Sequence, residues 1–103
     1  MPVRTLVTRT RPSELVPWYL HAREKNEYIK ATYIDTGNLI KTISASTDGL
    51  TQIVECIWSN KTVYNQSLKD PIINADNDVR NAYCEASGIV EESIIEVSNK
   101  KFK

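Results

Sequence analysis

The side chains of this chain best suited to bind or transform a ligand are its aromatic residues and its single histidine. Aromatic rings supply a large apolar contact area, and tyrosine and tryptophan add one polar group each. They suit a packed core, or the wall of a pocket in which a few polar groups orient a ligand. Packing in a hydrophobic core would explain most of these aromatic residues. A core role and a pocket role therefore both remain possible. We select six candidate ligand-binding residues: Trp18, His21, Tyr28, Trp58, Tyr64 and Tyr83.

His21 is the only histidine, and a histidine beside a pocket can act as a general base because its pKa lies near neutrality. No partner carboxylate can be identified from the sequence, so a partly buried or surface histidine is the simpler interpretation. The cysteines, Cys56 and Cys84, form no recognised ligand spacing with His21, and no metal site is predicted. Both cysteines are expected to be reduced, and no motif supports either as a nucleophile. With only 3 glycines there is no glycine-rich phosphate loop. No cofactor is predicted, and whether the chain is an enzyme stays undecided.

Length and charge narrow the function classes. The 103 residues fit one domain, 1–103. Lysine plus arginine and aspartate plus glutamate each number 13, so the formal net charge is zero. Without a global positive field, nucleic acid and anionic membranes are not the expected partners. No apolar run has the length of a signal peptide or a membrane span, and we expect a cytoplasmic protein.

Residues 39–58 are the stretch that must position the candidate site. Two β-rich runs flank residues 46–49, where Gly49 follows Asp48 as in a tight hairpin turn. The second run is apolar in both alternating phases, with Val54, Cys56 and Trp58 in one phase and Ile53 and Ile57 in the other. Because successive side chains of a strand point to opposite faces, this strand needs cover on both sides.

The other elements follow from periodicity and end signals. We predict a strand over residues 3–10, an irregular lead-in over 13–19 that contains Pro17, and an amphipathic helix over 19–34 that ends before Gly37. Ser59 or Asn60 can cap a short helix to residue 68, and Asp70-Pro71 starts a second segment that Gly88 ends. A strand over 89–97 and a polar, frayed tail over 98–103 complete the chain.

This order predicts an α+β, ferredoxin-like βαββαβ fold, with an antiparallel four-stranded sheet and the helices on one face. The apolar residues of the opposite phase would then lie in water, and each would forgo roughly 1.5 to 3 kcal/mol. A second copy covering that face is the simplest remedy, so we predict a homodimer through the sheet. We do not assign which strand phase faces the partner.

The sequence resembles the dimeric α+β barrel superfamily, in particular antibiotic-biosynthesis-monooxygenase-like and stress-responsive A/B barrel proteins. The residues that carry the resemblance are Asp48-Gly49-Leu50, Ile57-Trp58-Ser59 and the segment VYNQSLKDP at 63–71. The resemblance implies two ferredoxin-like subunits packed sheet against sheet, with an apolar pocket between sheet and helices. The superfamily's haem-degrading members use a histidine on the second helix. His21 lies on the predicted first helix, so that role is not carried over.

Three function classes fit the sequence. The leading hypothesis is binding of an apolar or aromatic, fatty-acid-like or polyketide-like molecule between helices and sheet, with residues 13–19 at the mouth and His21, Tyr28 or Arg11 as orienting groups. The alternatives are a cofactor-free, monooxygenase-like enzyme and a structural or interaction dimer without a ligand. RNA-recognition motifs share the topology but need stacking aromatic residues on the central strands and basic surroundings, and residues 5–10 and 51–57 contain no aromatic residue. Arg4, Arg9 and Arg11 are therefore interpreted as surface charge.

Overall fold

The computed structural model describes residues 2–21 and 23–97. The predicted polar tail, residues 98–103, lies outside this part of the chain. The elements follow in the order β1 (Val3–Thr10), α1 (Arg23–Ile29), η1 (Lys30–Ile34), β2 (Leu39–Ala45), β3 (Thr51–Trp58), α2 (Lys61–Leu68), α3 (Pro71–Ser87) and β4 (Val90–Val97). The predicted βαββαβ order is confirmed, with a second segment divided into α2 and α3.

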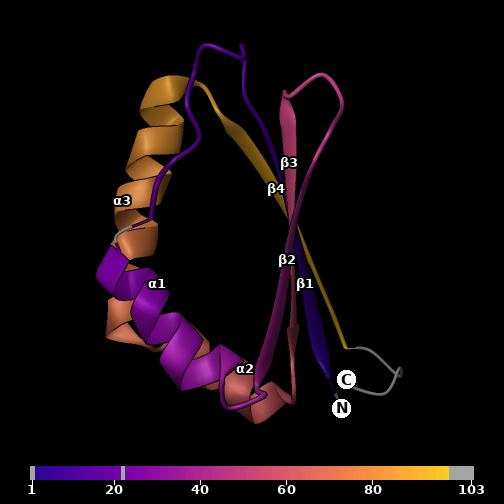
Figure 1. Ribbon diagram of the computed structural model, residues 1–103, viewed down its shortest axis with the longest axis vertical. Helices are drawn as coiled ribbons and strands as arrows, with labels where there is room; N and C mark the ends of the chain where they lie inside the picture. The colour runs from indigo at the N-terminus through magenta and orange to yellow at the C-terminus, as the bar shows by residue number, and fades with distance from the viewer. Residues whose placement is uncertain (1, 22, 98–103) are drawn as a thin grey trace.

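The strands form one antiparallel sheet in the order β2-β3-β1-β4. In the registers, Val3 is opposite both Trp58 and Val97, and Trp58 is opposite Leu39. All helices lie on one side of the sheet (Figure 1). The predicted ferredoxin-like arrangement is therefore confirmed for the single chain.

The helix boundaries follow the predicted end signals. The side chain of Asn60 accepts a hydrogen bond from the backbone amide of Val63 at 2.9 Å and so caps α2. Asp70 caps α3 by accepting from the amide of Ile72 at 3.0 Å, and Pro71 occupies the first turn. Gly88 follows α3 with φ +76°, in the left-handed conformation that glycine adopts without a steric penalty.

The first helix differs from its predicted bounds at both ends. Residues 17–21 have no regular structure, and α1 begins at Arg23 instead of near Tyr19. The last turn widens into η1, a π-helical turn in which the amide of Asp35 donates to the carbonyl of Lys30 at 2.8 Å. Gly37 then ends it as predicted, with φ +78°.

The core lies at one end of the layer between helices and sheet. Val3, Leu39 and Trp58 from the strands pack there against Ile29 and Tyr33, with Ile73 from α3. The inward positions farther along the strands are not closed in this way, because a cavity separates them from the helices. Within residues 2–21 and 23–97, no helix combines the length and the apolar character that a membrane span requires.

Candidate functional site

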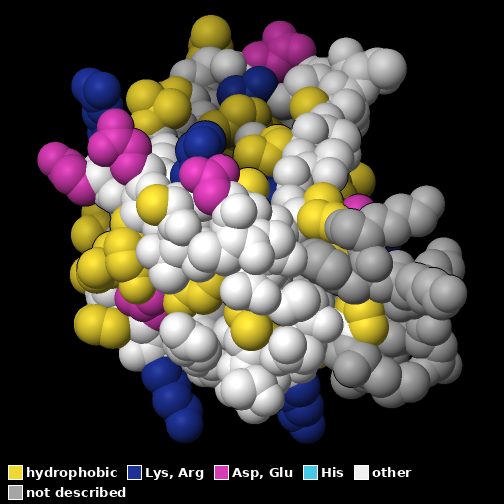
Figure 2. Space-filling view, turned by 60° about the horizontal axis from the view of Figure 1, so that its bottom comes forward, with side chains coloured by type: hydrophobic (Ala, Val, Ile, Leu, Met, Phe, Trp, Pro, Cys, Tyr) yellow, Lys and Arg dark blue, Asp and Glu magenta, His cyan; other side chains and the backbone are white. Residues whose placement is uncertain are grey.

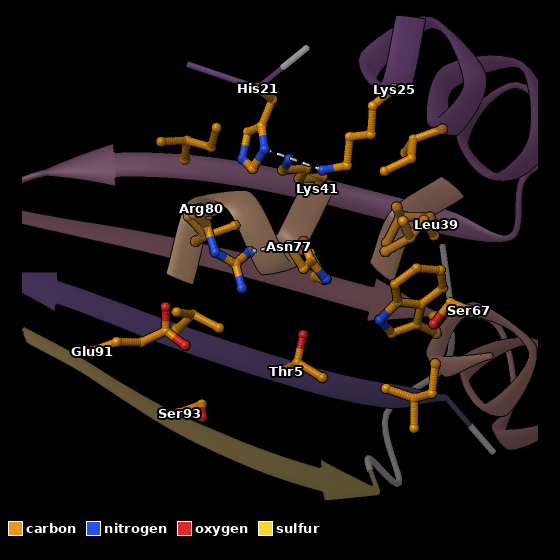
Figure 3. Close-up of a pocket in the computed structure, with 18 of the residues that line it drawn as sticks. Thr5, His21, Lys25, Leu39, Lys41, Ser67, Asn77, Arg80, Glu91 and Ser93 are labelled. Carbon is orange, nitrogen blue, oxygen red and sulfur yellow. Dashed lines mark hydrogen bonds between the residues drawn. The ribbon is translucent and has the colours of Figure 1, made fainter. Parts of the chain in front are cut away.

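A cavity of about 380 Å³ lies between the sheet and the helical layer (Figure 3). All four strands contribute their inward phase to it, through the residues Thr5, Val7, Arg9, Leu39, Lys41, Ile43, Gln52, Val54, Cys56, Trp58, Glu91, Ser93 and Ile95. The strand phase that contains Ile53 and Ile57 consequently lies on the opposite face. The structure therefore shows which strand phase faces the helices.

One end of the cavity is apolar and aromatic. Leu39 and Trp58 form the sheet side, and Ile29, Tyr64 and Ile73 form the helix side. Trp58 is only 8% exposed, and its ring lies 6.2 Å from that of Tyr64. Its indole Nε1, buried and without a hydrogen-bond partner in the described residues, is a donor left unused at this end.

The polar side of the cavity contains a histidine–aspartate pair. Nδ1 of His21 lies 2.5 Å from Oδ2 of Asp76, a buried carboxylate on α3. The same carboxylate accepts from the hydroxyl of Tyr19 at 3.0 Å and lies 3.6 Å from Nζ of Lys25. An ionised carboxylate can only accept, so we assign the imidazole proton to Nδ1. Asp76 therefore orients the ring.

The assignment leaves Nε2 of His21 as an acceptor, and no residue in the described ranges donates to it. Burial is the main effect on the pKa of His21 and lowers it, Lys25 and Lys41 lower it further, and the hydrogen bond and charge of Asp76 oppose this. On balance the pKa lies below its ordinary value. His21 is thus neutral at pH 7 and has the lone pair that a general base requires.

Four cationic side chains line the same cavity. Arg9 is buried and its Nε donates to Glu91 at 2.8 Å, so its interpretation as surface charge is wrong. The reason is its phase: Arg9 shares the inward face of β1 with Val3 and Val7. The other three cations are Lys25 from α1, Lys41 from β2 and Arg80 from α3.

Arg80 and Lys41 lack a carboxylate partner among residues 2–21 and 23–97. The two terminal nitrogens of Arg80 donate to Asn77 at 3.1 Å and to Asn81 at 3.2 Å, while its buried Nε has no partner. Lys41 forms neither a hydrogen bond nor an ion pair there. Figure 3 shows the end of Lys41 close to Lys25 and His21, with Arg80 and Asn77 on the neighbouring wall. The cavity wall is therefore more polar than the sequence predicted.

Of the six predicted site residues, the structure brings three together at the cavity: His21, Trp58 and Tyr64. The other three have different roles. Trp18 stacks against the guanidinium of Arg11, 4.8 Å from the ring centre, and Tyr83 donates to the carbonyl of Pro17 at 2.5 Å. Tyr28 donates to Asp70 at 2.5 Å.

Arg11 was expected to orient a ligand, but its hydrogen bonds are used within the chain. Its Nε donates to the carbonyl of Gly49 at 2.8 Å and its Nη1 to that of Val16 at 2.9 Å. These bonds tie the segment before α1 to the β2–β3 hairpin. The end of the predicted mouth segment does reach the cavity, because Tyr19 lines it.

Sequence reasoning missed Asp76, Lys25, Lys41 and Arg80 as site residues. The sequence pattern could have identified two of them, because Asp76 falls on the apolar stripe of α3 and Lys25 on that of the first helix. A charged residue within an apolar stripe needs a buried partner. Nothing in the sequence showed that these two residues would meet each other and His21.

The cysteines and surface charges suggest no other chemistry. Burial raises the pKa of the Cys56 thiol, which lines the cavity, so it is protonated and a poor nucleophile at neutral pH. No cluster able to hold a metal ion exists among the described histidine, cysteine, aspartate and glutamate residues. On the face shown in Figure 2, acidic and basic side chains are interspersed, in keeping with the zero net charge.

No protein-family model matches the sequence, and no curated protein matches it significantly. Solved structures do match. SnoaB, a cofactor-independent oxygenase from Streptomyces nogalater, is 11% identical with a TM-score of 0.58, over 97% of this chain and 95% of that chain. A proposed antibiotic-biosynthesis monooxygenase from Deinococcus radiodurans is 8% identical with a TM-score of 0.57, over 98% and 96%.

At these identities the similarity is one of fold. It confirms the predicted ferredoxin-like fold and the resemblance in fold to structures described as antibiotic-biosynthesis-monooxygenase-like. It assigns no activity, because one fold carries many functions.

Proposed function

We propose that the protein binds a small organic molecule, with an aromatic or other apolar body and one polar end, in the cavity between helices and sheet. The observation that carries this proposal is the cavity of about 380 Å³, which has an apolar end at Trp58 and Leu39 and a polar side at His21. Pockets for small molecules usually have this size and this division of wall chemistry.

The two tryptophans provide a test with a built-in control, because only Trp58 lines the cavity. A screen of fatty acids and polycyclic aromatic compounds is followed by tryptophan fluorescence. Binding should change the fluorescence of the Trp18→Phe variant, which keeps Trp58, and leave that of Trp58→Phe nearly unchanged. At 100 times its dissociation constant a ligand should also stabilise the fold by about 2.7 kcal/mol. Absence of any thermal shift would favour an interaction protein without a ligand.

A second candidate is catalysis, and the His21–Asp76 pair favours it. Nε2 of His21 would take a proton from an acidic C–H group of the bound molecule, and dioxygen would oxidise the resulting anion. For a CH₂ group, one oxygen atom becomes the product carbonyl and the other leaves as water with the two hydrogens. This is a cofactor-independent oxygenase reaction, the activity by which SnoaB, a similar fold, is described.

Oxygen consumption with an anthrone tests this candidate. A positioned general base contributes roughly 10² to 10⁴ to the rate. His21→Gln should therefore lose oxygen consumption by that factor while still binding the anthrone. His21 would have no part in the reaction if the variant oxidised the substrate at the unmodified rate.

We also propose that the protein is a homodimer through the sheet face that the helices leave open. Leu6, Ile53 and Ile57 lie on this face, and the exposed fractions of Ile40 and Ile94 are 37% and 61%. Registers pair Ile40 with Ile57 and Leu6 with Ile94, so the face has two apolar pairs on neighbouring strands. The ion pair of Arg4 and Glu55, at 2.6 Å, lies on the same face between them. A second copy would cover this face with the same surface.

A further inference from the structure

We propose that the cavity binds its ligand as an organic anion, with a carboxylate or phenolate oxygen placed among Lys41, Lys25 and Arg80. The inference rests on the proposed small-molecule function and narrows its ligand class. It extends the prediction of an apolar ligand by giving the polar end of that ligand a charge.

The first argument is the balance of charges at the cavity. The wall contains one described carboxylate, Glu91, and four cations: Arg9, Lys25, Lys41 and Arg80. Glu91 is paired with Arg9 at 2.8 Å. Asp76, next to the wall, already forms a hydrogen bond with His21 and an ion pair with Lys25. Two cations, Lys41 and Arg80, are left without a described carboxylate at ion-pair distance, although the charges of Glu91 and Asp76 still act on Arg80.

The second argument is the kind of polar atom left unsatisfied. Nε1 of Trp58 and Nε of Arg80 are the buried side-chain nitrogen or oxygen atoms without a partner in the described structure, and both can only donate. Both residues line the cavity, and Trp58 is more than nine-tenths buried. A buried donor without an acceptor destabilises the protein. The donor of Arg80 lies on the polar side, where the oxygens of an anionic ligand would be placed, whereas that of Trp58 lies at the apolar end and does not bear on the charge of the ligand.

The electrostatic environment agrees with this geometry. Burial lowers the pKa of Lys25, and the next cause is the positive charge of Lys41. Burial likewise lowers the pKa of Arg80, followed by the charge of Arg9. The charge of Asp76 opposes the lowering of both pKa values, and the charge of Glu91 opposes that of Arg80. The cations nevertheless lie close enough to repel one another in a partly desolvated space, where an anion would be attracted more strongly than in water.

The sheet register fixes how such a ligand would lie. Lys41 is two residues from Leu39 on the same face of β2, about 6.6 Å along the strand. Leu39 is in turn opposite Trp58. Figure 3 shows Leu39 and Ser67 toward one end of the cavity and Lys41, Arg80 and His21 away from it. An aromatic acid can thus place its ring against Trp58 while its carboxylate reaches Lys41.

A matched pair of probes tests the charge of the ligand. Naphthalene-2-carboxylate and naphthalene-2-carboxamide have nearly the same shape, and only the first is an anion at pH 7. Isothermal titration of the full chain measures the affinity of each probe for the unmodified protein, for Lys41→Met and for Lys61→Met. Lys61 is an exposed residue of α2 outside the cavity and serves as the control.

The carboxylate should bind the unmodified protein at least about ten-fold more tightly than the amide, as expected for charge-assisted hydrogen bonds. Lys41→Met should remove most of this difference, and Lys61→Met should leave it intact. Equal binding of acid and amide would overturn the anion site while leaving the small-molecule function standing. If neither probe binds, the anion site is overturned as proposed for aromatic acids, and the fluorescence screen decides the small-molecule function separately. The acid–amide comparison needs no variant, so it decides the question even if Lys41→Met does not fold.

Discussion

Asp76 is the residue on which the polar side of the cavity depends. Its buried carboxylate accepts hydrogen bonds from the hydroxyl of Tyr19 and from Nδ1 of His21, and it lies near the ammonium group of Lys25. A buried carboxylate is stable only with such partners, and each partner is held in place in return. The imidazole therefore has a fixed orientation and tautomer before any ligand arrives.

The pKa of His21 should move in opposite directions when two of its charged neighbours, Asp76 and Lys41, are removed one at a time. Asp76→Asn removes the hydrogen bond and charge that raise this pKa, so the pKa should fall further below its ordinary value of 6.5. Lys41→Met removes a positive charge that lowers it, so the pKa should rise. Because the chain has one histidine, an NMR titration of the imidazole carbon-bound protons follows a single set of signals.

Lys61→Met again serves as the control, and it should leave the titration unchanged. The direction of the two shifts is the decisive result, since loss of packing alone would not move the pKa up in one variant and down in the other. A His21 pKa that is insensitive to Asp76→Asn would mean that the pair does not form in solution.

Residue types were a poor guide to which aromatic side chains reach the cavity. Trp18 and Trp58 have the same chemistry, but Trp58 is on an inward phase of β3 and Trp18 lies beside Arg11. The direction of a side chain in an irregular segment has no periodicity from which it can be read. Lys41 was missed for the opposite reason, because a lysine on a strand is usually placed on the solvent side.

At the scale of elements, local end signals predicted the structure well. Asn60, Asp70-Pro71 and Gly88 mark helix boundaries through backbone requirements that do not depend on the rest of the fold. The start of α1 was misplaced because an apolar pattern that begins at Tyr19 continues without a break into the helix. In the structure, tertiary contacts with Asp76 hold Tyr19 and His21 in the segment before the helix.

Asp70 joins two elements, and its loss should cost more than the loss of an ordinary cap. Besides capping α3, Asp70 accepts the hydroxyls of Tyr28 and Tyr33 at 2.5 and 2.8 Å. Asp70→Ala should lower the free energy of unfolding by about 2 to 4 kcal/mol, from the lost cap and the unpaired hydroxyls. Asn60→Ala, which removes only a cap, should cost about 1 kcal/mol. Urea denaturation at pH 7 measures both.

The same contact predicts a pH dependence. Burial alone would raise the pKa of Asp70, but the hydroxyls of Tyr28 and Tyr33 and two backbone amides outweigh it, so the pKa is lowered. The stabilisation from Asp70 is then complete above the pKa of the unfolded chain and disappears as the pH falls through the lower, folded value.

Equal losses of stability for Asp70→Ala and Asn60→Ala at pH 7 would show that the tyrosine contacts contribute nothing.

At the scale of the whole molecule, the helices cover one face of the sheet and leave the other open. The inward phase meets the helices, partly through packed residues such as Trp58 and partly through the cavity. The double-sided apolarity of β3 predicted that both faces need cover, and the helices account for one. Which phase turns inward depends on the packing of every strand and helix together, so the sequence of β3 alone could not decide it.

The open face should therefore join two copies of the chain, and a charge placed on it should separate them. Sedimentation at micromolar concentration should give twice the chain mass for the unmodified protein. Ile57→Lys should give a monomer or an insoluble chain, because burying an unpaired ammonium group at the interface is costly. Val79→Lys is the control, since Val79 is 58% exposed on α3, on the helical layer, and this variant should remain a dimer. A monomeric unmodified protein would show that the apolar face tolerates water without a partner copy.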